Sequence, residues 1–236
     1  LASELDVARF SGWRGGELPP LQPVPRPAAA AGAARGGEVR VRALTEGAIE
    51  QAVLERLGAT RAGDRVDIAM FYISDRHVVE ALLAAARRGA EVRLLLDPNK
   101  DAFGRAKSGI PNRPVASELV SRSDGAIKVR WYRTHGEQFH VKMVRVTSGE
   151  ESWVTLGSAN LTRRNLGNYN LEANLAVEAP ANGAFAQELT RWFDTLWNNR
   201  APAGIEYTAD FGTFADPAQS SFWGYRIMEA TGLSTF

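Results

Sequence analysis

Apolar residues recur along the chain with two periods, and stretches of the two kinds alternate. Short β-rich runs, several alternating apolar and polar, predict strands at 39–42, 66–73, 92–96, 127–132, 139–146, 153–156 and 171–177. Spacings of three and four residues predict helices at 45–57, 75–88, 115–121, 185–197 and 217–231. The order strand, helix, strand in the first half implies parallel neighbours with right-handed crossovers. We therefore expect an α/β fold with a mixed, largely parallel β-sheet flanked by helices.

Helix-capping residues stand where several of these helices should begin. Thr45 is expected to cap the first helix, and Ser74 or Asp75 the second. Asp216 followed by Pro217 has the order typical of the start of a helix, and it precedes the last apolar stripe. These local signals agree with the helices predicted from periodicity.

Two segments lack the apolar periodicity that predicts packed helices or strands. Residues 1–38 hold five of the 11 prolines, between Pro19 and Pro27, followed by an Ala/Gly run. Such a composition buries little, so we expect a linker or inter-lobe segment, with 39–236 forming one lobe that ends in a helical segment. The polar stretch Asn99–Pro114 is too long for an idle connection and is expected to be a functional loop.

Composition narrows the function only a little. The 236 residues carry 28 Lys and Arg against 27 Asp and Glu, so no global field favours nucleic acid or an anionic membrane. Cysteine is absent, which excludes thiolate chemistry and leaves the compartment open, with an exported or membrane-peripheral location favoured over a cytoplasmic one. No apolar run approaches the roughly 20 residues of a transmembrane helix. The start at Leu1 suggests a piece of a longer protein.

A histidine and a lysine stand two residues apart in the predicted strand 139–146. Alternation along a strand places His140 and Lys142 on the same face. A neighbouring ammonium disfavours the protonated imidazole, which keeps a nucleophilic nitrogen available, and the ammonium can also neutralise a phosphate oxygen. A mixed surface face would look the same, so the pair needs support from other residues.

Further polar groups follow at the ends of the next strands. Ser158 and Asn160, in the run Gly-Ser-Ala-Asn, supply a hydroxyl and an amide close to the same strand ends. Glu172 supplies a carboxylate 12 residues later. Each alone would be read as a turn or a strand charge.

Together, the pattern His-x-Lys, Gly-Ser-x-Asn and a later carboxylate resembles the signature of the phospholipase D superfamily. Similarity to bacterial members extends over the runs 67–72, 94–99, 135–140 and 157–165, and from about Val39 to the end of the chain. One position departs from the family pattern. Where the family has an acid seven residues after the histidine, this chain has Thr147, and Gly157 comes later than usual, which suggests an enlarged hairpin.

The resemblance implies a phosphodiesterase that uses no metal or other cofactor and has two His-x-Lys lobes around a pseudo-twofold axis. One histidine attacks phosphorus to give a phosphohistidine, and the other protonates the leaving alcohol and later activates water or an acceptor alcohol. Lysine and asparagine side chains hold the phosphate oxygens, and Glu172 would orient His140. The site residues that follow are His140, Lys142, Asn160 and Glu172 as catalytic groups, with Ser158 and Arg163 as substrate-binding groups.

Only one copy of the motif is present, so a second lobe must complete the site. We expect either an N-terminal phospholipase D-like lobe of the same protein or a homodimer. The near-neutral charge favours a phospholipid over nucleic acid as the phosphodiester substrate. The alternatives are a nuclease with the same chemistry and a lobe that only binds or assembles, for which Thr147 is the best support. A metal site at His135, Glu137 and His140 lacks a tidy three-ligand geometry.

Overall fold

The structure is a computed structural model, and it describes residues 39–236 apart from 103–104, 107, 201–204, 216–218 and 232–236. The predicted linker 1–38 and the predicted cap Asp216–Pro217 lie outside the described residues. The elements, in chain order, are β1 Arg40–Thr45, α2 Gly47–Gly58, β2 Arg65–Met70, α3 Arg76–Arg87, β3 Glu91–Leu96, β4 Asp101–Ala102, β5 Arg105–Ala106, α4 Asn112–Arg122, β6 Lys128–Tyr132, β7 Lys142–Ser148, β8 Glu151–Gly157, α5 Arg163–Leu166, β9 Ala173–Pro180, α6 Ala184–Trp197, β10 Thr208–Asp210, the 3-10 turn η2 Phe211–Thr213 and α7 Gln219–Thr231.

Eight of the strands form one sheet in the order β1-β9-β8-β7-β2-β3-β6-β10. The pairs β2/β3 and β3/β6 are parallel, as α3 and α4 provide the crossovers between them. The other five pairs are antiparallel. The α/β class is therefore confirmed, but the expectation of a largely parallel sheet was wrong. The cause is the run β7-β8-β9, because β7 and β8 are joined by a tight turn, which permits only antiparallel pairing.

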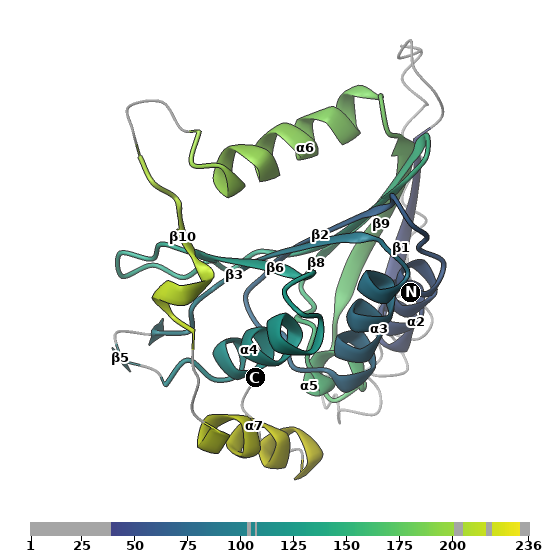
Figure 1. Cartoon of the computed structure of the whole chain (residues 1–236). Helices are drawn as coiled ribbons and strands as arrows, with labels where there is room; N and C mark the ends of the chain where they lie inside the picture. Colours follow the sequence, from purple (N-terminus) through teal and green to yellow (C-terminus); the bar gives the residue numbers. More distant parts are fainter. Residues whose placement is uncertain (1–38, 103–104, 107, 201–204, 216–218, 232–236) are drawn as a thin grey trace, which may run out of the picture. The chain divides into compact units, whose positions relative to one another are not determined.

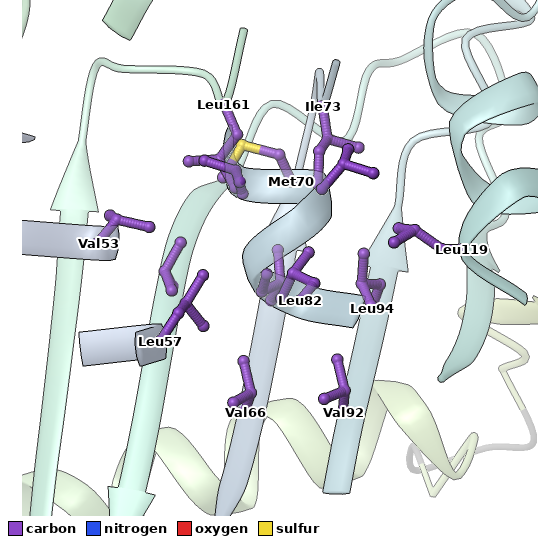
Figure 2. Packing of buried hydrophobic residues seen from close by; sticks show 14 of the residues in the cluster. Val53, Leu57, Val66, Met70, Ile73, Leu82, Val92, Leu94, Leu119 and Leu161 are labelled. Carbon is purple, nitrogen blue, oxygen red and sulfur yellow. The ribbon is translucent and has the colours of Figure 1, made fainter. Parts of the chain in front are cut away.

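Helices cover both faces of the sheet, with α2, α3 and α4 on one face and α6 on the other (Figure 1). The larger core lies beneath α2, α3 and α4. Figure 2 shows the helix side chains of Val53, Leu57, Leu82 and Leu119 meeting the strand side chains of Val66, Met70, Val92 and Leu94. Every one of these residues is fully buried. The apolar residues whose spacing predicted these helices and strands thus form this core.

Helix α6 packs on the opposite face over a smaller apolar cluster that contains Phe193. It is also held by Arg93 of β3, whose guanidinium donates to Asp67 at 2.7 Å and to Asp194 of α6 at 2.9 Å. The same guanidinium lies 4.9 Å from the centre of the Phe193 ring and 5.4 Å from that of Trp197. A buried arginine with two carboxylate partners and two ring faces ties α6 to one position on the sheet.

Of the predicted helix caps, the one at α3 is confirmed and the one at α2 is wrong. Asp75 caps α3 as expected, because its carboxylate accepts from the backbone N–H of Val78 at 3.0 Å. Thr45 does not cap α2. It ends β1, and the helix begins after Glu46, which has φ 53° and makes no side-chain cap bond. Strand pairing with β9 extends to Thr45 and so overrides the local capping preference.

The predicted functional loop Asn99–Pro114 contains the short strands β4 and β5 and the first turn of α4. Its two ends are buried. Asn112 donates to the carbonyl oxygens of Phe71 and Asp97, at 2.7 and 2.8 Å, and Asn99 donates to that of Phe71 at 3.0 Å. These bonds hold the ends of β2 and β3 together. In the described part of the chain, every helix is too short or too polar to cross a bilayer.

Candidate active site

His140 lies in an exposed segment immediately before β7. The predicted strand 139–146 in fact starts at Lys142, so the histidine is placed by its neighbours. The N–H of Phe139 donates to Asp97 at 2.7 Å, and the carbonyl of Val141 accepts from Phe71 at 2.9 Å. The imidazole ring lies 4.9 Å from the Phe71 ring. Both flanking residues are therefore fixed, and the imidazole itself stays accessible.

Lys142 is 7% exposed, and its Nζ donates to the carbonyl of His140 at 3.1 Å. Burial lowers the pKa of Lys142 to about 8, against the opposing effect of the Glu172 carboxylate. Burial, and after it the charge of Lys142, lowers the pKa of His140 from 6.5. At neutral pH the lysine is thus mostly charged and the imidazole mostly neutral, which is the pair of states expected from the sequence.

Glu172 is buried beside the beginning of β9, and its two oxygens have separate partners. One oxygen accepts from the hydroxyl of Ser158 and the other from the amide of Asn165. The carboxylate makes no hydrogen bond to His140 in the described part of the chain. The expected hydrogen bond from His140 to Glu172 is therefore absent among the described residues of this lobe. Glu172 instead accepts from Ser158 and Asn165, and its charge opposes the effect of burial, which lowers the pKa of Lys142.

The turn Gly157–Asn160 is folded closely against the start of β9. A Cβ atom on Gly157 would lie 2.3 Å from the carbonyl oxygen of Ala173 and 2.4 Å from Oδ1 of Asn174, so only glycine fits. Asn174 also accepts from the N–H of Ala159 at 3.2 Å. Ser158 is bonded on both sides, because its hydroxyl also accepts from the N–H of Ala173 at 3.0 Å. Ser158 therefore braces the turn.

Asn160 has a buried Oδ1 atom without a hydrogen-bond partner in the described structure. A buried polar atom left unpaired is costly, and such atoms in native proteins call for an explanation. Because amide oxygen and nitrogen can exchange places by a rotation of 180°, either an acceptor or a donor can occupy this position. With the nitrogen placed there, Asn160 could donate to a phosphate oxygen.

Arg163, the first residue of α5, directs its guanidinium toward α7. It donates to the carbonyl of Glu229 at 2.8 Å and lies 3.4 Å from the hydroxyl of Tyr169. It lines a pocket of about 350 Å³ together with Glu50 and His77. These contacts indicate that Arg163 helps to hold α7 in place. The predicted role of Arg163 in substrate binding is not supported by these contacts and stays a prediction.

Thr147, which replaces the acid of the family pattern, lies five residues after Lys142 in β7. At about 3.4 Å per residue, that is about 17 Å along the strand. It pairs with Arg65 and Ser152. The departure from the family pattern is therefore at the far end of the strand from the candidate site.

Sequence reasoning missed several residues that build the site. Asn165 and Asn174 hold Glu172 and the turn, and Asp97 holds the backbone beside His140. Asp97 carried a usable signal, because a polar residue directly after a buried parallel strand stands at the edge where ligands bind. Asn165 lay within the run 157–165 that carries the family resemblance, but nothing in that run identified its bond to Glu172. Asn174 gave no signal, because its partner Ala159 is 15 residues away.

The alternative metal site is not formed. Among the described residues, one group of three or more histidines and carboxylates has all its ligand atoms within 4.8 Å of one another, namely Glu50, Asp75 and His77, and it does not include His140. His135 lies 3.7 Å from Glu137, and both are exposed.

Comparison with known proteins gives one family. The model of the family described as cardiolipin synthase, PLD-like domain, matches residues 54–197, which include His140, Lys142, Asn160 and Glu172. No protein with a curated function matches the sequence significantly.

Solved structures share the fold. Nuc from Salmonella typhimurium, a phospholipase D family member, is 20% identical with a TM-score of 0.54, over 73% of this chain and 98% of its own. NucT from Helicobacter pylori is 16% identical with a TM-score of 0.51, over 68% and 97%. Phosphatidylserine synthase from Haemophilus influenzae Rd KW20 is 16% identical with a TM-score of 0.55, over 83% of this chain and 47% of its own.

Proposed function

Because the chain belongs to the phospholipase D-like family of the cardiolipin synthase type, we propose that it supplies one catalytic half-site of a phosphodiesterase. The reaction hydrolyses or transfers a phosphodiester through a phosphohistidine. The observation that carries this proposal is the exposed imidazole of His140 beside the buried ammonium of Lys142, both at one end of β7. A neutral nitrogen nucleophile next to a cation is what attack on an anionic phosphodiester requires.

The chemistry divides into two displacements. In the first, a ring nitrogen of one histidine attacks phosphorus, the bond from phosphorus to the leaving oxygen breaks, and the histidine of the other lobe gives that oxygen a proton. In the second, the same histidine takes a proton from water or an acceptor alcohol, whose oxygen attacks phosphorus and breaks the P–N bond. Lys142 and Asn160 hold phosphate oxygens as charge develops. His140 supplies one of the two imidazoles.

The second imidazole comes from another phospholipase D-like lobe, on the same protein or in a homodimer. This chain spans almost all of the Nuc chain but about half of the phosphatidylserine synthase chain. An exposed apolar strip, formed by Val41, Leu156 and Leu175, which are 60%, 37% and 47% exposed, adjoins the half-site. Leu156 directly precedes the turn that holds Ser158, so a lobe that covers the strip also reaches the site.

We propose that the substrate is a phospholipid and that the protein is exported or membrane-peripheral, where it would meet such a substrate. The balanced charge of the chain supports this choice over nucleic acid, because binding of a polyanionic strand gains its affinity from unpaired cations. The alternative is a nuclease with the same half-site chemistry, and an assay of both substrates distinguishes the two.

The test compares radiolabelled phospholipid vesicles with labelled single- and double-stranded DNA, incubated with the complete two-lobe assembly in EDTA. We expect cleavage of the phospholipid in the chelator and trapping of a labelled phosphohistidine by rapid denaturation at alkaline pH. His140→Ala should lower turnover by several orders of magnitude, while His135→Ala, a change at an exposed histidine of the same segment, should leave it within about twofold.

Two results would contradict the proposal. If turnover is lost in EDTA and recovers when a divalent ion is added, the reaction depends on a metal and the histidine-nucleophile mechanism is wrong. Cleavage of DNA but not of phospholipid would retain the mechanism and change the substrate.

A further inference from the structure

A groove of about 650 Å³ lies between α6 and the segment that carries His140. Six of the residues that line it define what is here named the α6 groove: Tyr132, Phe139, His140, Trp192, Leu196 and Tyr207. Its volume falls in the range of pockets that hold small organic molecules. The groove therefore starts at the candidate nucleophile and extends along α6.

The floor of the α6 groove is apolar and preformed. The rings of Tyr132 and Phe139 are stacked with centroids 4.5 Å apart and planes 12° apart. Tyr207 continues the series, with its ring 6.4 Å from that of Tyr132 and 24° from its plane. Phe139 and Leu196 belong to the apolar cluster beneath α6, which fixes the floor to the core. Trp192 is 36% exposed and offers part of its indole to a ligand.

The charges at the rim of the α6 groove cancel. Arg191 and Glu188, which both line it, form an ion pair at 2.6 Å. Burial, followed by the charge of Glu137, raises the pKa of Tyr132, which keeps its phenol neutral. A nucleic-acid strand would need several cations to meet successive phosphates, whereas Arg191, paired with Glu188, is the one Lys or Arg among the described residues that line the groove. A neutral, apolar group suits it.

We propose that the α6 groove binds the acyl part of a phospholipid-like phosphodiester whose phosphate lies at His140. This inference rests on the proposed function and adds the subsite that selects the substrate. The two meet at one residue, because His140 lines the groove and is also the candidate nucleophile. Binding of the acyl part would thus place phosphorus beside the imidazole.

The test measures binding rather than turnover. Short-chain phosphatidylcholines of increasing acyl length, each kept below its micelle concentration, are titrated into the 236-residue chain and followed by calorimetry. We expect the affinity to rise about threefold to fourfold for each methylene that enters the groove, as the burial of a methylene group implies. Glycerophosphocholine, which has the same headgroup and no acyl chain, should bind at least tenfold more weakly than the longest lipid.

Two variants locate the binding. Thr195→Trp, on the α6 wall of the groove, should fill the space and remove the dependence on acyl length. Trp192→Ala should weaken binding severalfold by removing an apolar wall. The matched control is Trp223→Ala, because Trp223 is 60% exposed on α7 and does not line the groove. It should bind like the wild type.

Three results would overturn the inference. The first is no binding of any lipid, the second is equal affinity for glycerophosphocholine and the longest lipid, and the third is an unchanged chain-length dependence in both groove variants. Binding of oligothymidylate that is lost in Thr195→Trp would assign the groove to nucleobases instead. Because His140→Ala should retain lipid binding, a failed hydrolysis assay with intact chain-length dependence would reject the proposed function and leave the groove assignment standing.

Discussion

At the scale of the residue, the role proposed for Lys142 conflicts with stability. Its folded-state pKa of about 8 lies below the usual 10.5, so folding disfavours its charged form. The cost is fully present below pH 8 and disappears as the pH rises above 10.5, where the unfolded chain has also lost the proton. The difference in pKa corresponds to about 3 kcal/mol as an upper bound.

We predict that Lys142→Met raises the free energy of unfolding at pH 7 by about 1 to 3 kcal/mol while activity is lost. The gain should shrink as the pH is raised from 8 to 10.5, which urea unfolding at a series of pH values measures. Lys128→Met, at an exposed lysine of β6, is the matched control and should change stability by less than about 0.5 kcal/mol. A less stable Lys142→Met at pH 7 would show that the lysine is a net stabilising group.

At the scale of the element, α7 is joined to the candidate site by one carboxylate. Glu229 is 4% exposed and accepts from the hydroxyl of Ser74 at 2.8 Å and from the N–H of Arg163 at 3.0 Å. Ser74 in turn donates its N–H to the carbonyl of Leu161, the residue after Asn160. The last helix of the chain therefore supports the turn that carries Asn160.

We predict that Glu229→Ala lowers the free energy of unfolding by about 2 kcal/mol, because two buried donors lose their acceptor. Glu229→Gln retains an acceptor and should stay within about 1 kcal/mol of the wild type. Burial raises the pKa of Glu229, so the stability it contributes is present at low pH and falls as the pH rises through the folded-state pKa. The stability of Glu229→Gln relative to the wild type should therefore increase as the pH rises from below 4.5 through the raised folded-state pKa. Urea unfolding at a series of pH values that shows no such trend would contradict this prediction.

At the scale of the whole molecule, a single lobe offers one His-x-Lys pair, whereas the proposed double displacement needs two imidazoles on opposite sides of phosphorus. We predict that the chain as a monomer is nearly inactive and that turnover appears only with a second lobe. Leu175→Glu in the exposed strip should weaken this assembly at least tenfold in sedimentation measurements, with turnover falling in parallel. Ile227→Glu, at an apolar residue of α7 that is 61% exposed, should assemble normally. Full activity of a monomer would contradict the half-site.

The sequence by itself determined the elements whose signals are local. The period of the apolar residues located seven of the eight strands of the large sheet and the helices α2, α3, α4, α6 and α7, but it missed the short elements β10 and α5. Asp75 was recognisable as a cap because its partner, Val78, is three residues away. The family pattern pointed to His140, Lys142 and Asn160 without any knowledge of the sheet, because it needs only their spacing along the chain.

Only the tertiary structure decided which elements pair and what surrounds the site. The antiparallel majority of the sheet depends on partners such as β1 and β9, which are far apart in the sequence and leave no mark on the period of either strand. Glu172 bonds to Ser158 and Asn165 rather than to His140, because the folded turn brings these groups together. The α6 groove exists only because Arg93 and the apolar cluster hold α6 across the sheet from the other helices. Each of these outcomes is set by non-local packing, which apolar periodicity along one segment cannot encode.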